Sequence, residues 1–448
     1  MLSRAWLPLF LWAASAAAQP GGIVLNADER GAAVPLPRPW AVAIEGGSIA
    51  GGQRSTWLEA LRVATQECGF SGVALDDVFA PALRMDEGYI YADDVLDRVA
   101  ALNVRPVLEL RGGAAAVGAL ARHVTDRYNI TDVRQWRFEL QADSPVDYAE
   151  EAAAVRKADG QLAVGLRLPA SALNGLDRWL AGLRRLGAPL DFLSLVPGGD
   201  PDPDLFSSAA ARLRRAGYPA AKVRIADWPS RPIGPDFSRD EMPLAVYLLK
   251  ANLRAPASVG TLSYWRLCDE PEDRGPLRGI LHGGPGLLTF QGLVKPAFHA
   301  YRYLNALGED VLQSVPGGIV TRRRQSGRLV VLAYNYPDGA PSFPPAAPTL
   351  ADADRLTASG RPRPLSITLT GLQPGGQILI EWVDPQHANT AEAWREMGSP
   401  EAPGRQALDS LRAAARAAVV EYRQADDGGH FTDTRELPAW GMLLLREL

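Results

Sequence analysis

The stretch RPVLELRGGAAAVGALARHV, residues 105–124, contains one predicted strand followed by one predicted helix, and this unit decides the fold. Its first six residues form a short run rich in apolar side chains, which is typical of a buried strand. From residue 115 to residue 124, apolar residues recur at helical spacing. The stretch therefore predicts one βα unit of a parallel sheet.

The same unit recurs along the chain up to residue 307. Strands are predicted at residues 40–44, 72–75, 105–110, 136–141, 162–168, 191–196, 222–226 and 260–265. Helices are predicted at residues 57–67, 95–102, 115–124, 148–158, 172–186, 205–216, 243–253 and 297–307. Eight strands alternating with eight helices predict an α/β protein with a (β/α)8 TIM barrel. A doubly wound open sheet has the same alternation and stays open as an alternative.

The pattern changes after residue 307. Strand-and-turn segments such as GGIVTRRRQSGRLVVLAYNYP and PLSITLTGLQPGGQILIEWVD alternate with stretches rich in Gly, Pro and Asn. We therefore expect a C-terminal β-sandwich over residues 309–448, interrupted by one amphipathic helix at residues 407–420. The barrel is expected to occupy residues 19–308.

The first 18 residues are typical of a secretory signal peptide. Arg4 gives a positive start, residues 5–14 form a short apolar run, and Ala16-x-Ala18 is a small-residue cleavage site. A buried first strand is the alternative. We predict export, with a periplasmic or secreted protein. No other segment approaches about 20 apolar residues, so no integral membrane segment is expected after cleavage.

Composition excludes several function classes. The net charge of −4 gives no basic stripe for nucleic acid. Five His residues are scattered singly, and neither Cys68 nor Cys268 has metal-ligand spacing, so no metal or other cofactor is expected. We expect the two cysteines to be buried thiols rather than a disulfide.

Four longer motifs carry a resemblance to a known family. They are WLEALRVATQECGF, LSYWRLCDEPED, LHGGPGLLTFQGLVKPAFHAYRYLNALG and VDPQHANTAEAWREMGSPEAP. From about residue 33 to its C-terminus the chain resembles the family 39 glycoside hydrolases, which include β-xylosidases and α-L-iduronidases. The resemblance implies a catalytic (β/α)8 barrel, a C-terminal β-sandwich and a carbohydrate substrate.

The resemblance also implies where the catalytic residues lie. In the family the fourth strand typically ends FEVWNEP, with the last Glu as acid/base, and the seventh ends ITEW, with Glu as nucleophile. This chain has FELQADSP and RIADW, so Asp143 takes the acid/base position and Asp227 the nucleophile position. Ala142 replaces the Asn that holds the sugar 2-hydroxyl. Glu139 matches an earlier, structural or supporting Glu.

Other residues at the same strand ends are expected to bind substrate. These are Asp76 and Asp77, where GVALDD replaces the family's RFHG, and the aromatic residues Trp228, Tyr264 and Trp265. Each has a purely structural alternative. Asp143 could cap the next helix, the two acids after the second strand could stabilise a turn, and the three aromatic side chains could belong to the core.

Asp in place of Glu at both catalytic positions affects the expected chemistry. Retaining glycosidases hold their carboxyl groups about 5–5.5 Å apart, and inverting enzymes about 6.5–9.5 Å. If both Asp carboxyls withdraw by one bond, the separation grows to about 8 Å, so the pair could support inversion, support slow retention after a loop movement, or perform no catalysis. The leading interpretation is an exported glycoside hydrolase acting on a poly- or oligosaccharide. The alternatives are a catalytically degenerate barrel that binds glycan or assists polysaccharide export, and a carbohydrate-binding protein led by its sandwich.

Overall fold

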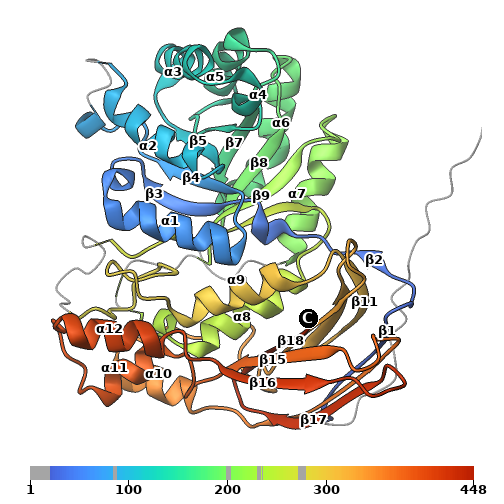
Figure 1. The fold of residues 1–448 in the computed structure, drawn as a ribbon. Helices are drawn as coiled ribbons and strands as arrows, with labels where there is room; N and C mark the ends of the chain where they lie inside the picture. The colour runs from blue at the N-terminus through green and yellow to red at the C-terminus, as the bar shows by residue number, and fades with distance from the viewer. Residues whose placement is uncertain (1–20, 84–87, 198–202, 230–233, 235, 271–278) are drawn as a thin grey trace, which may run out of the picture.

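A closed barrel forms the first part of the protein. The computed structural model describes residues 21–83, 88–197, 203–229, 234, 236–270 and 279–448. Eight parallel strands close in the order β10-β3-β4-β5-β6-β7-β8-β9 (Figure 1). They are β3 (Ile44–Ser48), β4 (Gly72–Asp76), β5 (Arg105–Leu110), β6 (Arg137–Leu140), β7 (Ala163–Pro169), β8 (Phe192–Val196), β9 (Lys222–Trp228) and β10 (Val259–Tyr264). The predicted barrel is confirmed, and the open sheet is excluded.

A helix follows each barrel strand and covers its outer face. These helices are α1 (Ser55–Cys68), α2 (Ile90–Ala101), α3 (Gly113–Arg127), α5 (Pro145–Ala158), α6 (Leu176–Arg185), α7 (Pro203–Arg215), α8 (Met242–Leu253) and α9 (Pro296–Ala306). A short extra helix, α4 (Ile130–Val133), precedes β6. In α1, the buried residues Trp57, Leu61 and Ala64 lie on one face, as helical periodicity requires.

Local sequence explains where individual helices start and stop. Helix α1 ends at Gly69, whose φ of 72° lies in the left-handed region that glycine adopts without strain. Helix α5 begins after Ser144, whose side chain accepts a hydrogen bond from the Asp147 N–H, and Pro145 takes the first helical position. These signals fix both helices relative to the strands that they follow.

The first barrel strand lies later in the chain than expected. Residues 40–44 were predicted as the strand, but Pro39–Ala41 form a 3-10 turn and β3 covers Ile44–Ser48. The strand contains two glycines, Gly46 and Gly47, which lower its intrinsic strand propensity. For this reason the sequence pattern did not predict it. Pairing with β4 and β10 in the closed sheet overrides that propensity.

Two sheets form the C-terminal part, as predicted. The seven-stranded sheet contains β16 (Val419–Gln424), β15 (Gln377–Val383), β18 (Met442–Glu447), β13 (Leu329–Tyr334), β12 (Gly318–Arg322), β11 (Asp310–Val315) and β2 (Val34–Pro35). The second sheet contains β1 (Ile23–Asp28), β14 (Arg363–Thr370) and β17 (Phe431–Leu437). Alternate residues of β14 are buried, which is the pattern of a strand with one face on a core.

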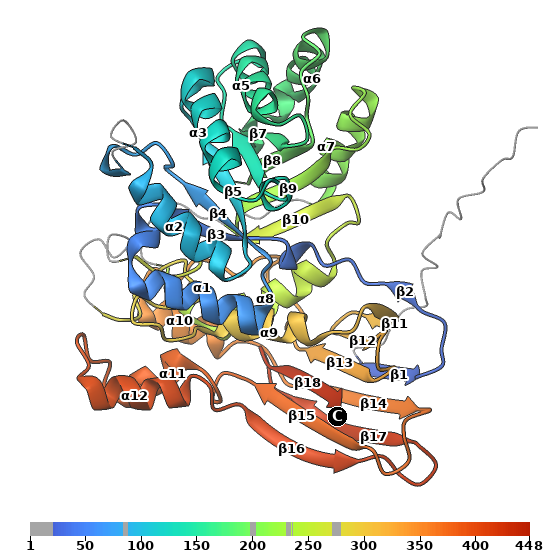
Figure 2. The same cartoon turned by 45° about the horizontal axis from the view of Figure 1, so that its top comes forward.

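The N-terminal segment departs from the predicted domain boundary. We expected residues 19–308 to form the barrel, but β1 pairs with β14 in parallel register and β2 pairs with β11. Figures 1 and 2 show this segment lying beside the C-terminal strands. Ile23 and Leu25 are buried in the sandwich core. The chain therefore enters the sandwich first, builds the barrel, and then returns.

The prediction of one helix within the sandwich is wrong. Three helices are inserted: α10 (Leu350–Thr357), α11 (Thr390–Glu396) and α12 (Arg405–Ala414). The predicted helix at 407–420 ends six residues early, because β16 begins at Val419. Helix α10 starts with a capping box formed by Thr349 and Asp352, in a stretch where no helix was predicted.

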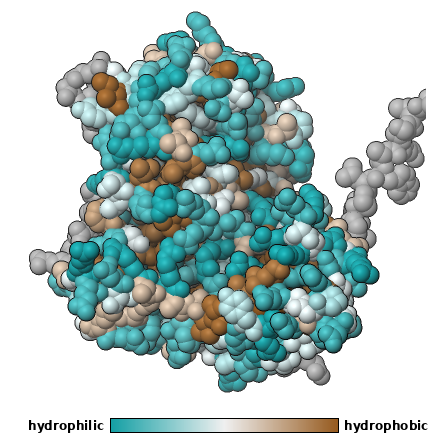
Figure 3. Space-filling model, in the orientation of Figure 1, coloured by the Kyte–Doolittle hydropathy of each residue, from teal (hydrophilic) through white to brown (hydrophobic). Residues whose placement is uncertain are grey.

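Barrel and sandwich share a continuous apolar core. Helices α8 and α9 lie between the barrel strands and the C-terminal sheets in both views (Figures 1 and 2). One cluster of buried residues runs from barrel residues such as Leu108 to sandwich residues such as Leu332 and Leu444. On the face shown in Figure 3, apolar side chains gather in a band across the middle of the molecule. The two parts are therefore packed as one body.

Two further expectations concern the ends and the cysteines. The predicted signal peptide, residues 1–18, lies outside the described residues, so its fate stays a prediction. Across the described ranges, no helix is long and apolar enough to cross a membrane. Cys68 and Cys268 are both buried, and no disulfide joins them, as expected.

Candidate active site

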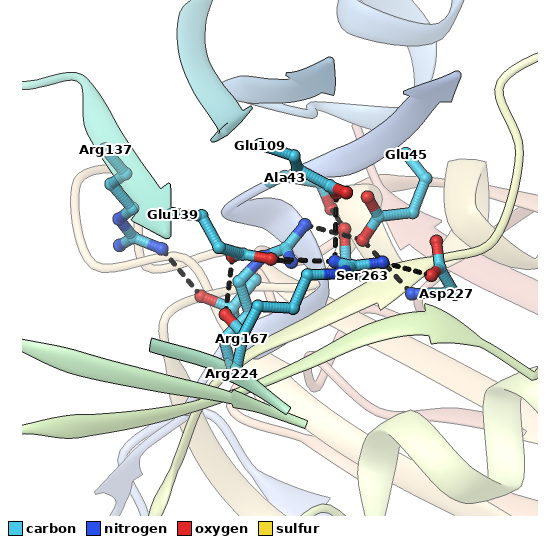
Figure 4. Close-up of polar contacts among 11 residues, drawn as sticks. Ala43, Glu45, Glu109, Arg137, Glu139, Arg167, Arg224, Asp227 and Ser263 are labelled. Carbon is cyan, nitrogen blue, oxygen red and sulfur yellow. Dashed lines mark hydrogen bonds and ion pairs between the residues drawn. The ribbon is translucent and has the colours of Figure 1, made fainter. Parts of the chain in front are cut away.

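The barrel interior below its C-terminal mouth is filled by charged side chains. Barrel interiors are usually packed with branched apolar residues. Here five strands contribute ionisable groups that contact one another, and Figure 4 shows them converging in the barrel. The members of this ion network are Glu45 on β3, Glu109 on β5, Glu139 on β6, Arg167 on β7, and Arg224 and Asp227 on β9.

Glu139 lies at the centre of the network and is fully buried. Arg224 Nη1 lies 2.9 Å from Glu139 Oε2, and Arg167 Nη1 lies 2.7 Å from Oε1. The hydroxyl of Ser194 also donates to Oε2. Burial alone would raise the pKa of Glu139, but the two guanidinium groups outweigh it and lower that pKa. Glu139 is therefore an ionised structural group, in agreement with the role expected for it.

The carboxyl groups of Glu109 and Glu45 have pKa values above their usual range. Burial raises the pKa of Glu109 well above its usual range, although Arg167 Nη1 lies 3.0 Å from it. Burial also raises the pKa of Glu45, despite its 2.6 Å contact with Arg224. The network holds four carboxyl groups against two guanidinium groups, and the excess of acidic groups adds to the effect of burial on these two pKa values.

Asp227 lies at the end of β9 on the edge of this network. Its Oδ2 accepts a hydrogen bond from Arg167, and its backbone N–H donates to Glu45 Oε1 at 3.2 Å. The side chain is 24% exposed. The backbone has a φ of 48°, in the left-handed region that few non-glycine residues occupy. Such strain is found most often at functional sites, where surrounding contacts hold it in place.

Asp76 is the last residue of β4, at the same end of the barrel as Asp227. Its side chain is half-buried, and burial raises its pKa to about 6, which outweighs the attraction of Arg266. Asp227 and Asp77 raise it further, so Asp76 faces the same group of charges. Asp77 differs, because it is exposed and its carbonyl accepts a hydrogen bond from the Ala80 N–H. The turn alternative therefore describes Asp77.

Asp143 lies in the loop after β6 and is 86% exposed. Arg111 Nη2 lies 3.7 Å from its carboxylate. It does not cap the next helix, because Ser144 does. Asp143 lines an open cavity of about 370 Å³ between the loops after β5 and β6. Its neighbour Ala142 is buried and carries no donor for a sugar hydroxyl.

Two of the three aromatic residues belong to the core. Trp228 is 1% exposed and packs against Tyr247, and Tyr264 is 2% exposed and packs against Tyr301. The burial of these two side chains is what the core alternative expects, and their substrate contact stays a prediction. Trp265 is only partly buried, and its ring stacks under the guanidinium of Arg239.

Sequence reasoning missed most of the ion network. Glu109, Arg167 and Arg224 lie within strands that were recognised by their apolar residues, whereas Glu45 lies just beyond the residues that were predicted as the first strand. A signal was present, because charged residues interrupt otherwise apolar strands in RPVLEL, LAVGLRL and KVRIA. Side chains at alternate strand positions face the barrel interior, so each of these charges had to find a partner there.

The described residues give no metal site. No group of three or more His, Cys, Asp or Glu side chains within the described ranges is placed to hold a metal ion. The carboxylates of the network are held by arginine side chains instead. The carboxylates of this arrangement can perform proton transfer, nucleophilic attack and hydrogen bonding to hydroxyl groups.

Known glycoside hydrolases are similar to this chain in sequence. The family model Glycosyl hydrolases family 39 matches residues 217–431, which include Asp227. A β-xylosidase of Geobacillus stearothermophilus is 24% identical over 87% of this chain and 88% of its own length. These matches show that the chain is similar to family 39 glycoside hydrolases. A second β-xylosidase, from Caldicellulosiruptor saccharolyticus, is 24% identical over 83% of this chain and 87% of its own length.

Solved structures show the same fold. The GH39 enzyme from Xanthomonas axonopodis pv. citri has a TM-score of 0.82 at 21% identity, and covers 95% of this chain and 97% of its own. A monomeric β-xylosidase from Caulobacter crescentus CB15 has a TM-score of 0.80 at 21% identity, with coverage of 95% and 99%. The family match and the β-xylosidase relatives together support glycosidase activity and a carbohydrate substrate.

Proposed function

We propose that the protein is an exported glycoside hydrolase that cleaves O-glycosidic bonds of a poly- or oligosaccharide. Asp227 acts as nucleophile or general base, and Asp143 is the candidate acid. Because two relatives are β-xylosidases, β-xylosides are the first substrates to test.

The environment of Asp227 carries this proposal. It lies at the C-terminal end of a barrel strand, where the βα loops of TIM barrels build their active sites. Its carboxylate is held by an arginine from one side and remains partly exposed on the other. A buried structural acid would have both oxygens satisfied, whereas a group that attacks a sugar or a water needs one oxygen free.

Asp143 has a less constrained environment. A general acid has to reach the glycosidic oxygen, and a loop residue that is 86% exposed can move to do so. Both acids are one methylene shorter than the family's glutamates, which favours a separation near 8 Å and an inverting reaction. We therefore expect the released sugar to have the opposite anomeric configuration to the substrate.

A glycan-binding barrel without hydrolytic activity is the second candidate. It is favoured by the exposure of Asp143 and by Ala142, which cannot hold the sugar 2-hydroxyl. A hydrogen bond at that position supplies several kcal/mol in the transition state of glycosidases. Such a protein would retain affinity for a glycan and show no turnover.

A substrate screen separates the two candidates. The protein is incubated with aryl glycosides and with plant and bacterial polysaccharides, while binding is followed by calorimetry and released sugar by proton NMR. Turnover with inverted product supports the proposal. Binding without turnover on every substrate supports the second candidate instead and ends the enzymatic proposal.

Export is proposed from the sequence of residues 1–18. The test is N-terminal sequencing of the protein secreted by a bacterial host that carries the full gene. Cleavage near Gln19 is the expected result. A mature chain that still begins at Met1 would contradict export.

A further inference from the structure

Arg167 connects the candidate nucleophile to the interior of the barrel. It extends from β7, and Nη2 donates to Asp227 Oδ2 while Nη1 lies 2.7 Å from Glu139 and 3.0 Å from Glu109 (Figure 4). The side chain is only 11% exposed. One planar guanidinium therefore contacts three carboxyl groups from three other strands.

Further contacts inside the barrel fix the position of Arg167. Its partner Glu139 also accepts hydrogen bonds from Arg224 and from the hydroxyl of Ser194. Arg224 in turn is fixed by Glu45 at 2.6 Å. Each of these side chains is buried. The guanidinium of Arg167 thus has a fixed orientation, since a planar fork with several charge-assisted bonds has little freedom to rotate.

The two carboxylate oxygens of Asp227 have different surroundings. Oδ2 is bound by Arg167, whereas Oδ1 accepts no hydrogen bond from any described residue. The main chain at Asp227 is also fixed, because its N–H donates to Glu45 Oε1. With both ends of the residue restrained, the position of Oδ1 is determined by the contact that Arg167 makes to the other oxygen.

We propose that Arg167 is a positioning residue for catalysis, which holds Oδ2 of Asp227 so that Oδ1 is presented to the substrate or to the attacking water. This inference rests on the proposed function, because it gives Asp227 a reaction to perform. No bond to Arg167 forms or breaks. Its contribution is geometric, and a misplacement of about 1 Å at a reacting group can lower a rate by about 10²-fold.

The experiment compares two substitutions of Arg167 on the best substrate of the screen. Arg167→Gln removes the cation, and we expect kcat to fall about 100-fold with KM changed by less than about threefold, because ground-state binding does not need Oδ1 in place. Arg167→Lys keeps the charge without the planar fork. We expect it to recover about a tenth of wild-type kcat.

A matched control lies in the same barrel. Arg137 on β6 is partly buried and donates to the Thr261 hydroxyl at 3.0 Å, without contacting Asp227. Arg137→Lys should therefore leave kcat within about twofold of wild type. If Arg167→Gln does not fold because Glu139 loses one of its two arginine partners, Arg167→Lys, which keeps the positive charge, decides the question alone.

Three results would overturn the inference. Folded Arg167 variants with wild-type kcat would show a purely structural role. A rise in kcat would show that Arg167 blocks Asp227. A parallel loss in Arg137→Lys would show a general effect of barrel packing. If the wild-type protein hydrolyses nothing, the proposed function itself fails and this inference fails with it, whereas an active wild type confines the failure to Arg167.

Discussion

At the scale of single residues, Glu139 determines whether the barrel interior is electrostatically stable. It is fully buried and receives hydrogen bonds from two arginines and a serine. Removing one partner of a buried ion pair leaves the other partner's charge uncompensated, which costs about 3–5 kcal/mol. The same pair replaced as a whole by apolar residues would cost far less.

We therefore expect Glu139→Gln to lower the free energy of unfolding by about 3–5 kcal/mol, as measured by urea denaturation. The reason is that Arg167 and Arg224 then face a neutral amide instead of a carboxylate. Glu59→Gln serves as control, since Glu59 pairs with Arg62 on the exposed face of α1. Equal effects of the two substitutions would contradict a buried ionic centre.

Asp76 gives a prediction about pH. Its pKa is raised to about 6 in the folded protein by burial, against 3.8 for the ordinary side chain. The folded state therefore binds this proton more tightly than the unfolded state, and stability falls as the pH rises from about 4 through 6. Each unit of difference corresponds to about 1.4 kcal/mol.

In Asp76→Asn this part of the pH dependence should disappear. Thermal unfolding measured from pH 4 to pH 7 should show a smaller loss of stability with rising pH than the wild type does, and a more stable variant above pH 6. A variant whose curve parallels that of the wild type would mean that Asp76 titrates normally in the folded protein.

Part of the site was accessible from the sequence at this scale. Asp143 and Asp227 could be placed because local motifs at two strand ends resemble family motifs. The partners of Asp227 could not be placed, because Arg167 lies 60 positions away and the contact depends on how the barrel closes. The burial of Trp228 and Tyr264 likewise depends on helices packed from elsewhere in the chain.

At the scale of elements, helix α5 follows the loop that contains Asp143. Its N-cap is Ser144, whose side chain accepts a hydrogen bond from the Asp147 N–H at 3.2 Å. Its hydroxyl also donates to the Asp147 carboxylate. The N-cap thus lies one residue after the candidate acid, and leaves Asp143 outside the helix.

Ser144→Ala should lower the free energy of unfolding by about 1 kcal/mol, as loss of an N-cap does. Asp143→Ala should have a smaller effect, because its side chain makes no cap and is largely exposed. Chemical denaturation of both variants measures the difference. A larger loss for Asp143→Ala would restore the capping alternative for that residue.

The elements themselves were predicted with uneven success. The eight barrel helices were found because apolar residues recur along them at helical spacing. The first barrel strand was misplaced because its glycines carry little strand signal. The extra helices α10 and α11 are short, so their periodicity is weak, and α10 was visible only through its capping residues.

At the scale of the whole molecule, the N-terminal strand ties the two parts of the protein together. Strand β1 precedes the barrel in sequence but completes the sheet formed by β14 and β17. No local pattern in residues 23–28 could reveal this, because the partner strands follow more than 300 residues later. The sandwich therefore cannot be removed or expressed as a C-terminal piece without breaking a sheet.

We expect Leu25→Ala on β1 to destabilise the protein by about 2–5 kcal/mol. Leu25 is fully buried in the sandwich core, beside Gly318. Val24 lies on the same strand with half of its surface exposed, so Val24→Ala is the matched control and should have little effect. Similar losses for both variants would mean that β1 is not packed in the core.

The central claim is that glycoside hydrolysis occurs at Asp227, and the rate of the Asp227→Asn variant tests it most directly. The measurement is kcat/KM on the best substrate of the screen, for wild type and variant, with circular dichroism to verify that both are folded. Loss of a carboxylate that attacks or activates water should lower kcat/KM by at least about 10²–10⁴-fold. A folded Asp227→Asn variant that keeps wild-type kcat/KM would contradict the claim.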